Sequence, residues 1–84
     1  MRSDYITFRS VTVAQRGERL LKGGGIDCIL QRTPRWMEER GCGYCLRVHP
    51  EDVQESLQRL KEGSVPFSKV YTKRPNGAVE EMGK

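Results

Sequence analysis

The order of strand-type and helix-type hydrophobic patterns is the feature that most constrains the fold of this chain. An alternating pattern rich in aromatic and β-branched residues at positions 4–9 predicts a half-buried strand. A helical stripe follows and ends at the glycine run 23–25, which is typical of a helix C-terminus. The remaining patterns predict two strands, a helix and a strand, in that order, at residues 26–32, 44–48, 50–62 and 67–72.

The resulting order, β-α-β-β-α-β, is that of the ferredoxin-like fold. This is an α+β architecture in which two helices cover one face of a four-stranded antiparallel sheet. We expect a single domain over residues 4–72 and a flexible C-terminal tail over residues 73–84, which contain a Pro-Asn-Gly turn and no apolar stripe. A chain of 84 residues is too short for a two-domain enzyme, and its radius of gyration should be roughly 12 Å.

Residues typical of helix termini and interiors refine the first helix. Ser10 and Thr12 are both suitable N-caps, and Thr12 together with Gln15 would form a capping box. Gly17 lies inside the helix and costs it about 1 kcal/mol relative to alanine. A glycine at this position indicates that the helix backbone approaches another element closely.

Charge and cysteine content indicate which partners and which cellular compartment to expect for the protein. Fifteen Lys and Arg against eleven Asp and Glu give a net charge of +4, a mild excess that leaves an anionic partner open. The three cysteines are an odd number, so an internal disulfide framework cannot pair them all. No apolar run is long enough for a signal peptide or a membrane span. We therefore expect a cytoplasmic protein with reduced thiols and no membrane partner.

Cys42 is the candidate reactive residue. It ends a long arginine-rich connection that contains Arg35 and Arg40, and Gly43 directly after it leaves the backbone and sulfur accessible. Nearby cations and backbone N–H groups lower the pKa of a thiol and make it nucleophilic. A small apolar side chain buried at a loop–strand junction is the alternative interpretation, and the residues themselves leave both open.

Cys42 and Cys45 also form a C-x-x-C pair. In redox proteins the first cysteine of such a pair begins a helix, whereas a strand follows here, so a reversible disulfide is disfavoured. Cys28 and His49 would complete a Cys3His zinc set. Because Cys28 lies within an apolar strand pattern and His49 precedes the second helix, we expect no metal and no cofactor.

Aromatic residues suggest a different kind of interaction. If Tyr5 and Tyr44 both faced the open side of the sheet, they would resemble the stacking platform of an RNA-recognition module. The aromatic-rich motif that this module carries on its third strand is absent, so nucleic acid is disfavoured as a partner. Trp36, in the arginine-rich connection, could anchor that connection, cover the thiol or dock a partner.

Several segments of the chain resemble the selenium/sulfur carrier protein-like family, which comprises short bacterial proteins of uncharacterised function. These segments are residues 5–10, 19–22, 33–35, 42–43 and 46–48, followed by the acidic start of the second helix. The resemblance runs over about residues 4–72, and its most telling parts are the Thr-Pro-Arg segment and the Cys-Gly pair. It implies that Cys42 carries sulfur or selenium as a persulfide or selenopersulfide. Cys45 departs from the family, which usually has a small apolar residue there.

Two functions of different classes follow from these observations. In the first, the protein is a carrier or relay and not an enzyme: Cys42 accepts sulfur or selenium from a donor protein and passes it to an acceptor protein. The residues expected to surround the transferred atom are Thr33, Arg35, Arg40, Gly43 and Cys45. In the second, the protein is a non-catalytic interaction or regulatory module that dimerises or docks through its sheet face, and Cys42 is structural.

The location of Cys45 depends on which face of the sheet its strand presents to the helices. We expect Tyr44 on the open face, which would direct Cys45 toward the helices and bury it. Desolvation would then raise the pKa of the Cys45 thiol and make it unreactive. The opposite orientation would place Cys45 beside Tyr5 on the open face, where it could attack a persulfide on Cys42.

Overall fold

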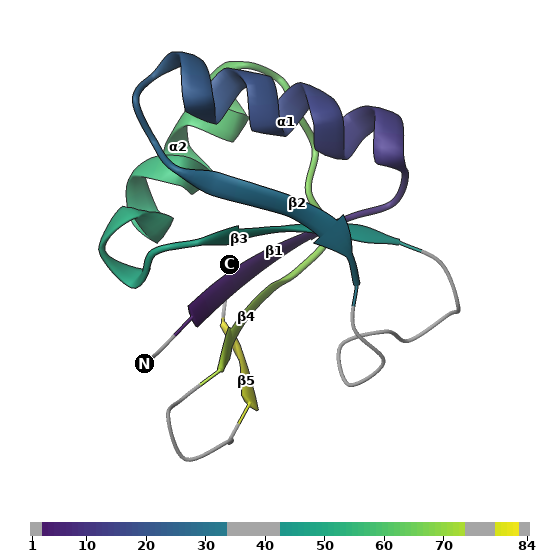
Figure 1. Ribbon diagram of the computed structural model, residues 1–84, viewed down its shortest axis with the longest axis vertical. Coiled ribbons are helices and arrows are strands. Elements are labelled where there is room, and N and C mark those ends of the chain that lie inside the picture. The colour runs from purple at the N-terminus through teal and green to yellow at the C-terminus, as the bar shows by residue number, and fades with distance from the viewer. Residues whose placement is uncertain (1–2, 34–42, 74–78, 83–84) are drawn as a thin grey trace.

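An antiparallel sheet with two α-helices on one of its faces forms this protein (Figure 1). The computed structural model describes residues 3–33, 43–73 and 79–82. The elements are β1 (Ser3–Phe8), α1 (Val11–Gly23), β2 (Cys28–Arg32), β3 (Tyr44–Val48), the 3₁₀ helix η1 (Pro50–Asp52), α2 (Val53–Glu62), β4 (Val70–Lys73) and β5 (Val79–Met82). Through β4 the order is β-α-β-β-α-β, which confirms the predicted α+β ferredoxin-like fold.

The sheet has five strands where four were predicted, in the order β2-β3-β1-β4-β5. The additional strand, β5, lies within residues 73–84, where the sequence predicted a tail, and it pairs antiparallel with β4. The predicted Pro-Asn-Gly turn lies outside the described residues. Without β5, the outer backbone groups of β4 would be unpaired, and a strand can satisfy them without an apolar stripe of its own. The absence of an apolar stripe therefore did not show that these residues lack a strand.

The ends of α1 follow from local chemistry. Ser10 is the N-cap, and its Oγ accepts a hydrogen bond from the backbone N–H of Val13 at 3.3 Å. Thr12 lies inside the first turn, so the predicted Thr12–Gln15 capping box is wrong. The helix ends at the glycine run as predicted, and Gly25 has φ +83°, a conformation that favours glycine.

The remaining boundaries differ from the predicted ones by a few residues. β2 begins at Cys28 rather than at residue 26, and β4 begins at Val70 rather than at residue 67. The second helix starts as the 3₁₀ turn η1 and continues as α2 up to its predicted C-cap, Gly63. The radius of gyration is 11.7 Å, in agreement with the expected value.

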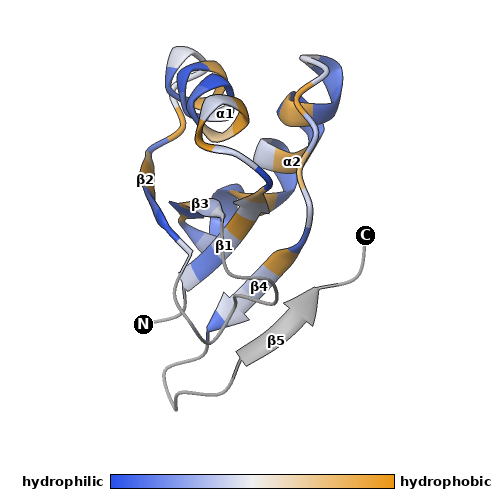
Figure 2. Ribbon diagram, turned by 90° about the vertical axis from the view of Figure 1, so that its right-hand side faces the viewer, coloured by the Kyte–Doolittle hydropathy of each residue, from blue (hydrophilic) through white to orange (hydrophobic). Residues whose placement is uncertain are grey.

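The hydrophobic core lies between the two helices and the sheet face that they cover (Figure 2). Its fully buried side chains include Ile6, Leu21, Leu46 and Leu60. The opposite face of the sheet, here called the open face, carries a smaller buried cluster that consists of Tyr5, Cys45 and Tyr71.

Gly17 lies where α1 is closest to the core. A Cβ atom at this position would lie 3.2 Å from Leu60 Cδ2, 3.2 Å from Phe8 Cζ and 3.4 Å from Leu46 Cδ1. These contacts are tight, and all three side chains are at most 2% exposed. The predicted close approach of the helix backbone to another element is confirmed.

Gly17→Ala should therefore destabilise the protein, although alanine is the better helix former. The propensity gain of about 1 kcal/mol is offset by overpacking of a filled core, which typically costs about 1–3 kcal/mol. We expect a net loss of about 1 kcal/mol in the free energy of unfolding, measured by urea denaturation. Gly23→Ala is the matched control, because nothing lies within 4 Å of its Cβ position. Equal stability of the two variants would contradict the packing argument.

Candidate functional site

The base of the connection between β2 and β3 is the part of the candidate site that the structure describes. The backbone N–H of Thr33 donates a hydrogen bond to the carbonyl O of Gly43 at 3.1 Å. This bond extends the β2–β3 ladder by one residue pair beyond Arg32 and Tyr44. Two of the predicted site residues, Thr33 and Gly43, are thus brought together at the end of the sheet.

The other residues predicted for the connection, Arg35, Trp36, Arg40 and Cys42, lie outside the described residues. The roles assigned to them stay predictions. What the structure adds is that the two residues flanking positions 34–42, Thr33 and Gly43, are hydrogen-bonded to each other.

Gly43 is packed closely on both sides. A Cβ atom on it would lie 3.3 Å from the carbonyl O of Phe8 and 3.3 Å from Thr33 Oγ1. The sequence indicated a glycine that keeps the neighbouring Cys42 accessible. The structure shows an additional reason for a glycine here, since the chain passes against the end of β1.

Cys45 lies on the open face, and the predicted orientation of β3 is wrong. Leu46 and Val48 are buried in the core beneath the helices, and Tyr44, which has the same parity, packs against that core. Cys45 therefore points the other way, opposite Thr7 of β1 and Gln31 of β2. Tyr44, Leu46 and Val48 on one side of β3 offer more apolar surface for burial than Cys45 on the other side. The helices therefore cover the side with these three residues.

Cys45 is nevertheless completely buried, as predicted. Desolvation raises the pKa of its thiol from an ordinary 9.0 to about 11, while the side chains of Thr33 and Gln31 act weakly in the opposite direction. Thr33 Oγ1 is itself buried, and it makes no hydrogen bond of good geometry with any described residue. The Thr7 hydroxyl is engaged with the backbone of Lys69. At neutral pH Cys45 is therefore a protonated thiol.

The two tyrosines considered for a stacking platform lie on opposite faces of the sheet. Tyr5 belongs to the cluster on the open face, and Tyr44 packs toward the helices. Tyr5 and its cross-strand neighbour Tyr71 are each only 8% exposed. The platform that would have used Tyr5 and Tyr44 together is not formed.

Cys28 occupies a different environment from Cys45. It lies on the helix-covered face, is buried, and its Sγ donates a long hydrogen bond of 4.0 Å to the carbonyl O of Glu18. Burial, followed by the charge of Glu18, raises the pKa of the Cys28 thiol. Because Cys28 and Cys45 lie on opposite faces of the sheet, they cannot share one tetrahedral metal site. Within the described ranges, no three potential ligands cluster.

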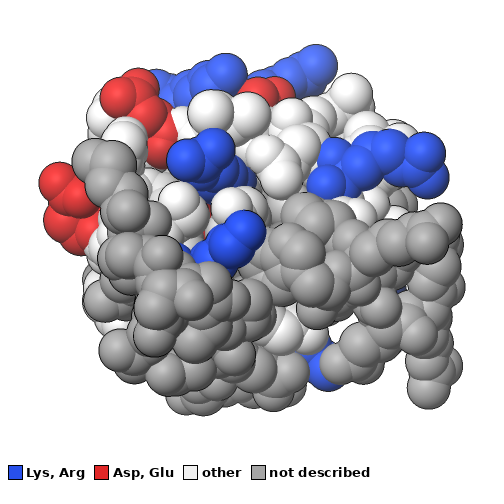
Figure 3. All heavy atoms as spheres, turned by 60° about the horizontal axis from the view of Figure 1, so that its bottom comes forward, with Lys and Arg blue, Asp and Glu red and all other residues white. Residues whose placement is uncertain are grey.

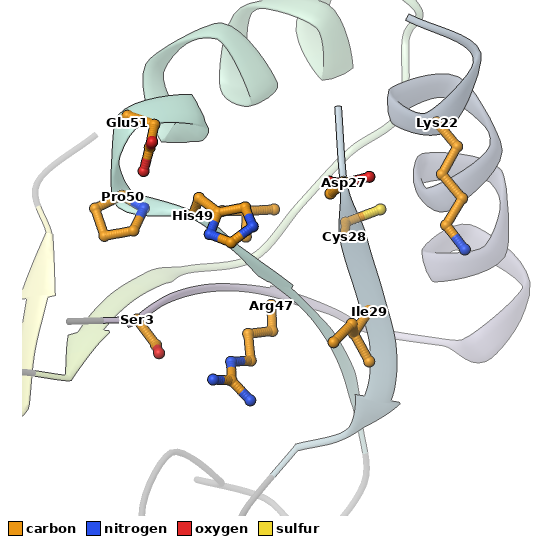
Figure 4. A pocket seen from close by; sticks show the side chains of 10 residues that line it. Ser3, Lys22, Asp27, Cys28, Ile29, Arg47, His49, Pro50 and Glu51 are labelled. Carbon is orange, nitrogen blue, oxygen red and sulfur yellow. The ribbon is translucent and has the colours of Figure 1, made fainter. Parts of the chain in front are cut away.

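A surface hollow of about 690 Å³, which the sequence did not reveal, lies beside the start of β2 (Figure 4). Its lining mixes the cations Lys22 and Arg47 with the acids Asp27 and Glu51. The sulfur of Cys28 points toward α1, whereas Arg47 points to the other side of the sheet (Figure 4). These groups do not converge on one point. The lining comes from β1, α1, β2, β3 and η1, which are far apart in the chain, so no local sequence pattern indicates the hollow.

The charged residues on the described surface are dispersed. In Figure 3, Lys and Arg side chains are separated by uncharged surface and by Asp and Glu, and they form no continuous basic patch on the described part of this face. Elsewhere in the described structure, two helix ion pairs join Lys22 to Glu18 and Arg59 to Glu55. This distribution agrees with the modest net charge of +4.

Comparison with known proteins identifies one family. Residues 4–72 match the family model described as "Putative Se/S carrier protein-like". No curated protein and no solved structure matches the chain. In the described part of the chain, no helix is long and apolar enough to cross a bilayer.

Proposed function

Because this chain belongs to the selenium/sulfur carrier protein-like family, we propose that it carries sulfur or selenium on Cys42. The Cys42 thiolate attacks the terminal sulfur of a persulfide on a donor protein. The donor S–S bond breaks, the donor cysteine leaves as a thiolate, and Cys42 holds the transferred atom as a persulfide. Selenium transfer follows the same course and leaves a selenopersulfide. The exchange needs no external oxidant, and transfer to an acceptor protein repeats it.

The burial of the two described cysteines supports the choice of Cys42. Cys45 is completely buried with a thiol pKa of about 11, and burial likewise raises the pKa of the Cys28 thiol. A buried, protonated thiol is a poor nucleophile toward a protein-bound persulfide. This objection applies to Cys28 and Cys45 and leaves Cys42, the remaining cysteine of the sequence, as the candidate.

The neighbouring residues have distinct roles in this proposal. Arg35 and Arg40 stabilise the Cys42 thiolate and the terminal sulfur or selenium anion electrostatically. Thr33 and Gly43 hold the ends of the connection together through their backbone hydrogen bond. Cys45 is a buried neighbour that does not resolve the persulfide. The protein itself is a non-enzymatic cytoplasmic carrier between a donor and an acceptor protein.

Incubation with a persulfide donor should increase the intact mass of the wild-type protein by one sulfur atom, and Cys42→Ser should abolish this gain. Mass spectrometry under non-reducing conditions measures the adduct directly. Cys45→Ala is the matched control and should gain the sulfur as readily as wild type, because its thiol is buried. A Cys42→Ser protein that gains sulfur as fast as wild type would refute the proposal.

A further inference from the structure

Strand β2 is an edge of the sheet, since its neighbour on one side is β3 and the described residues place none on the other. The hydrogen bond from Thr33 N–H to Gly43 shows that Thr33 directs its backbone groups toward β3. Directions alternate along an antiparallel strand, so the N–H and C=O groups of Cys28, Leu30 and Arg32 point outward from the sheet. These groups are available to pair with another strand.

The same strand also carries the most exposed large hydrophobic side chain of the described structure. Ile29 is 57% exposed, and no other large hydrophobic side chain in the described ranges is as exposed. Natural edge strands are usually protected from pairing by proline, by internal charges or by a covering element. β2 contains no proline, and its one charged residue, Arg32, stands at its C-terminal end. This edge is therefore suited to pairing.

The pattern of side chains over residues 27–31 is symmetric about Ile29. Asp27 and Gln31 are polar, whereas Cys28 and Leu30 are apolar. A two-fold symmetric interface requires a surface that is complementary to itself. Over residues 27–31, an antiparallel pair of two such strands centred on Ile29 sets apolar against apolar and polar against polar.

We infer that the β2 edge is a homodimer interface, in which β2 pairs antiparallel with β2 of a second copy and the two sheets become continuous. Cys28 and Leu30 exchange backbone hydrogen bonds with Leu30 and Cys28 of the second copy. Ile29 meets its symmetry mate at a non-hydrogen-bonded position, where side chains approach most closely. Gln31 of the second copy lies opposite Asp27 and can donate to its carboxylate.

This geometry places the helices of both copies on the same side of the joined sheet. The two β2 strands can form hydrogen bonds only in registers that set the outward-pointing residues of one copy opposite those of the other. In such registers, the side chains that face the helices in one copy lie on the same face of the joined sheet as those that face the helices in the other. The cores beneath α1 and α2 remain intact in each copy, and the edge of β2 is no longer exposed to other chains. The interface differs from docking through the open face, because it uses the backbone of one strand and a single exposed side chain.

Sedimentation equilibrium over a wide concentration range tests the inference. The wild-type protein should show twice its chain mass of 9.6 kDa, and Ile29→Lys should weaken dimerisation at least about tenfold, because two lysines would face each other at the symmetry axis. Circular dichroism should show an unchanged fold, since Ile29 is exposed in the single chain. Gln54→Lys on the exposed side of α2 is the charge-matched control and should dimerise like wild type. A monomeric wild type, or a dimer that Ile29→Lys leaves intact, would overturn the inference.

Disulfide trapping tests the register. In a Cys42→Ser background, Ile29→Cys should form an intermolecular disulfide under mild oxidation, because residues paired at the symmetry axis have Cα atoms about 4.5 Å apart. Gln31→Cys in the same background should not, since it lies opposite Asp27. Efficient trapping through Gln31→Cys, or through neither variant, would contradict a pair centred on Ile29.

Discussion

In the native protein, one thiol should react rapidly with a maleimide and two should react at least about a hundredfold more slowly. Cys28 is 6% exposed and Cys45 is not exposed at all. A pKa of about 11 leaves roughly one Cys45 thiol in ten thousand ionised at pH 7. All three cysteines should react at once after unfolding. A time course followed by intact mass and peptide mapping measures the three rates separately.

The rapid phase of this reaction is assigned to Cys42, so the control is Cys42→Ser, which should remove that phase and leave the slow reactions unchanged. Rapid labelling of two thiols in the wild type would show that Cys45 or Cys28 is accessible to reagents of this size. A Cys42–Cys45 disulfide after mild oxidation would have the same consequence for Cys45. Either result would require a revised role for Cys45 in the proposed transfer.

Raising the pH from about 9 to about 11 should lower the free energy of unfolding through Cys45 by about 2 kcal/mol. Below pH 9 the thiol is protonated in both the folded and the unfolded protein, so its contribution is fully present. Above that pH the unfolded chain releases the proton while the folded protein retains it up to about pH 11. The unfolded state therefore gains stability as the pH rises.

Urea denaturation at several alkaline pH values measures this effect, with Cys45→Ala as the reference. Other groups, including Cys28 with its raised pKa, titrate in both proteins, so the difference between the two curves isolates Cys45. The wild type should lose stability more steeply than Cys45→Ala over this range. Parallel curves would mean that the thiol has an ordinary pKa and is solvated in the folded protein.

The candidate site could be predicted from the sequence only in part. The Cys-Gly pair and the Thr-Pro-Arg segment identify the connection between β2 and β3, and the family match over residues 4–72 confirms the resemblance on which this rested. The contact between Thr33 and Gly43 was not predictable, because it depends on the pairing of β2 with β3. The hollow beside Cys28 also escaped prediction, since its lining comes from segments far apart in the chain.

Local patterns in the sequence determined the order of the elements, the end of α1 at its glycine run and the parity of β3. These properties depend on neighbouring residues, through the 3.6-residue period of a helix, the two-residue period of a strand and the conformational preferences of cap residues. The sequence also determined that Gly17 must approach another element, because a glycine inside a helix is otherwise unfavourable.

Only the tertiary structure decided which face of β3 meets the helices and which strand completes the sheet. Alternation shows that Tyr44, Leu46 and Val48 share a face, but it does not show which face is covered. That choice depends on how much apolar surface the paired strands and both helices bury together. Likewise, β5 forms because it satisfies backbone groups along β4, a long-range requirement that its own side chains do not reveal.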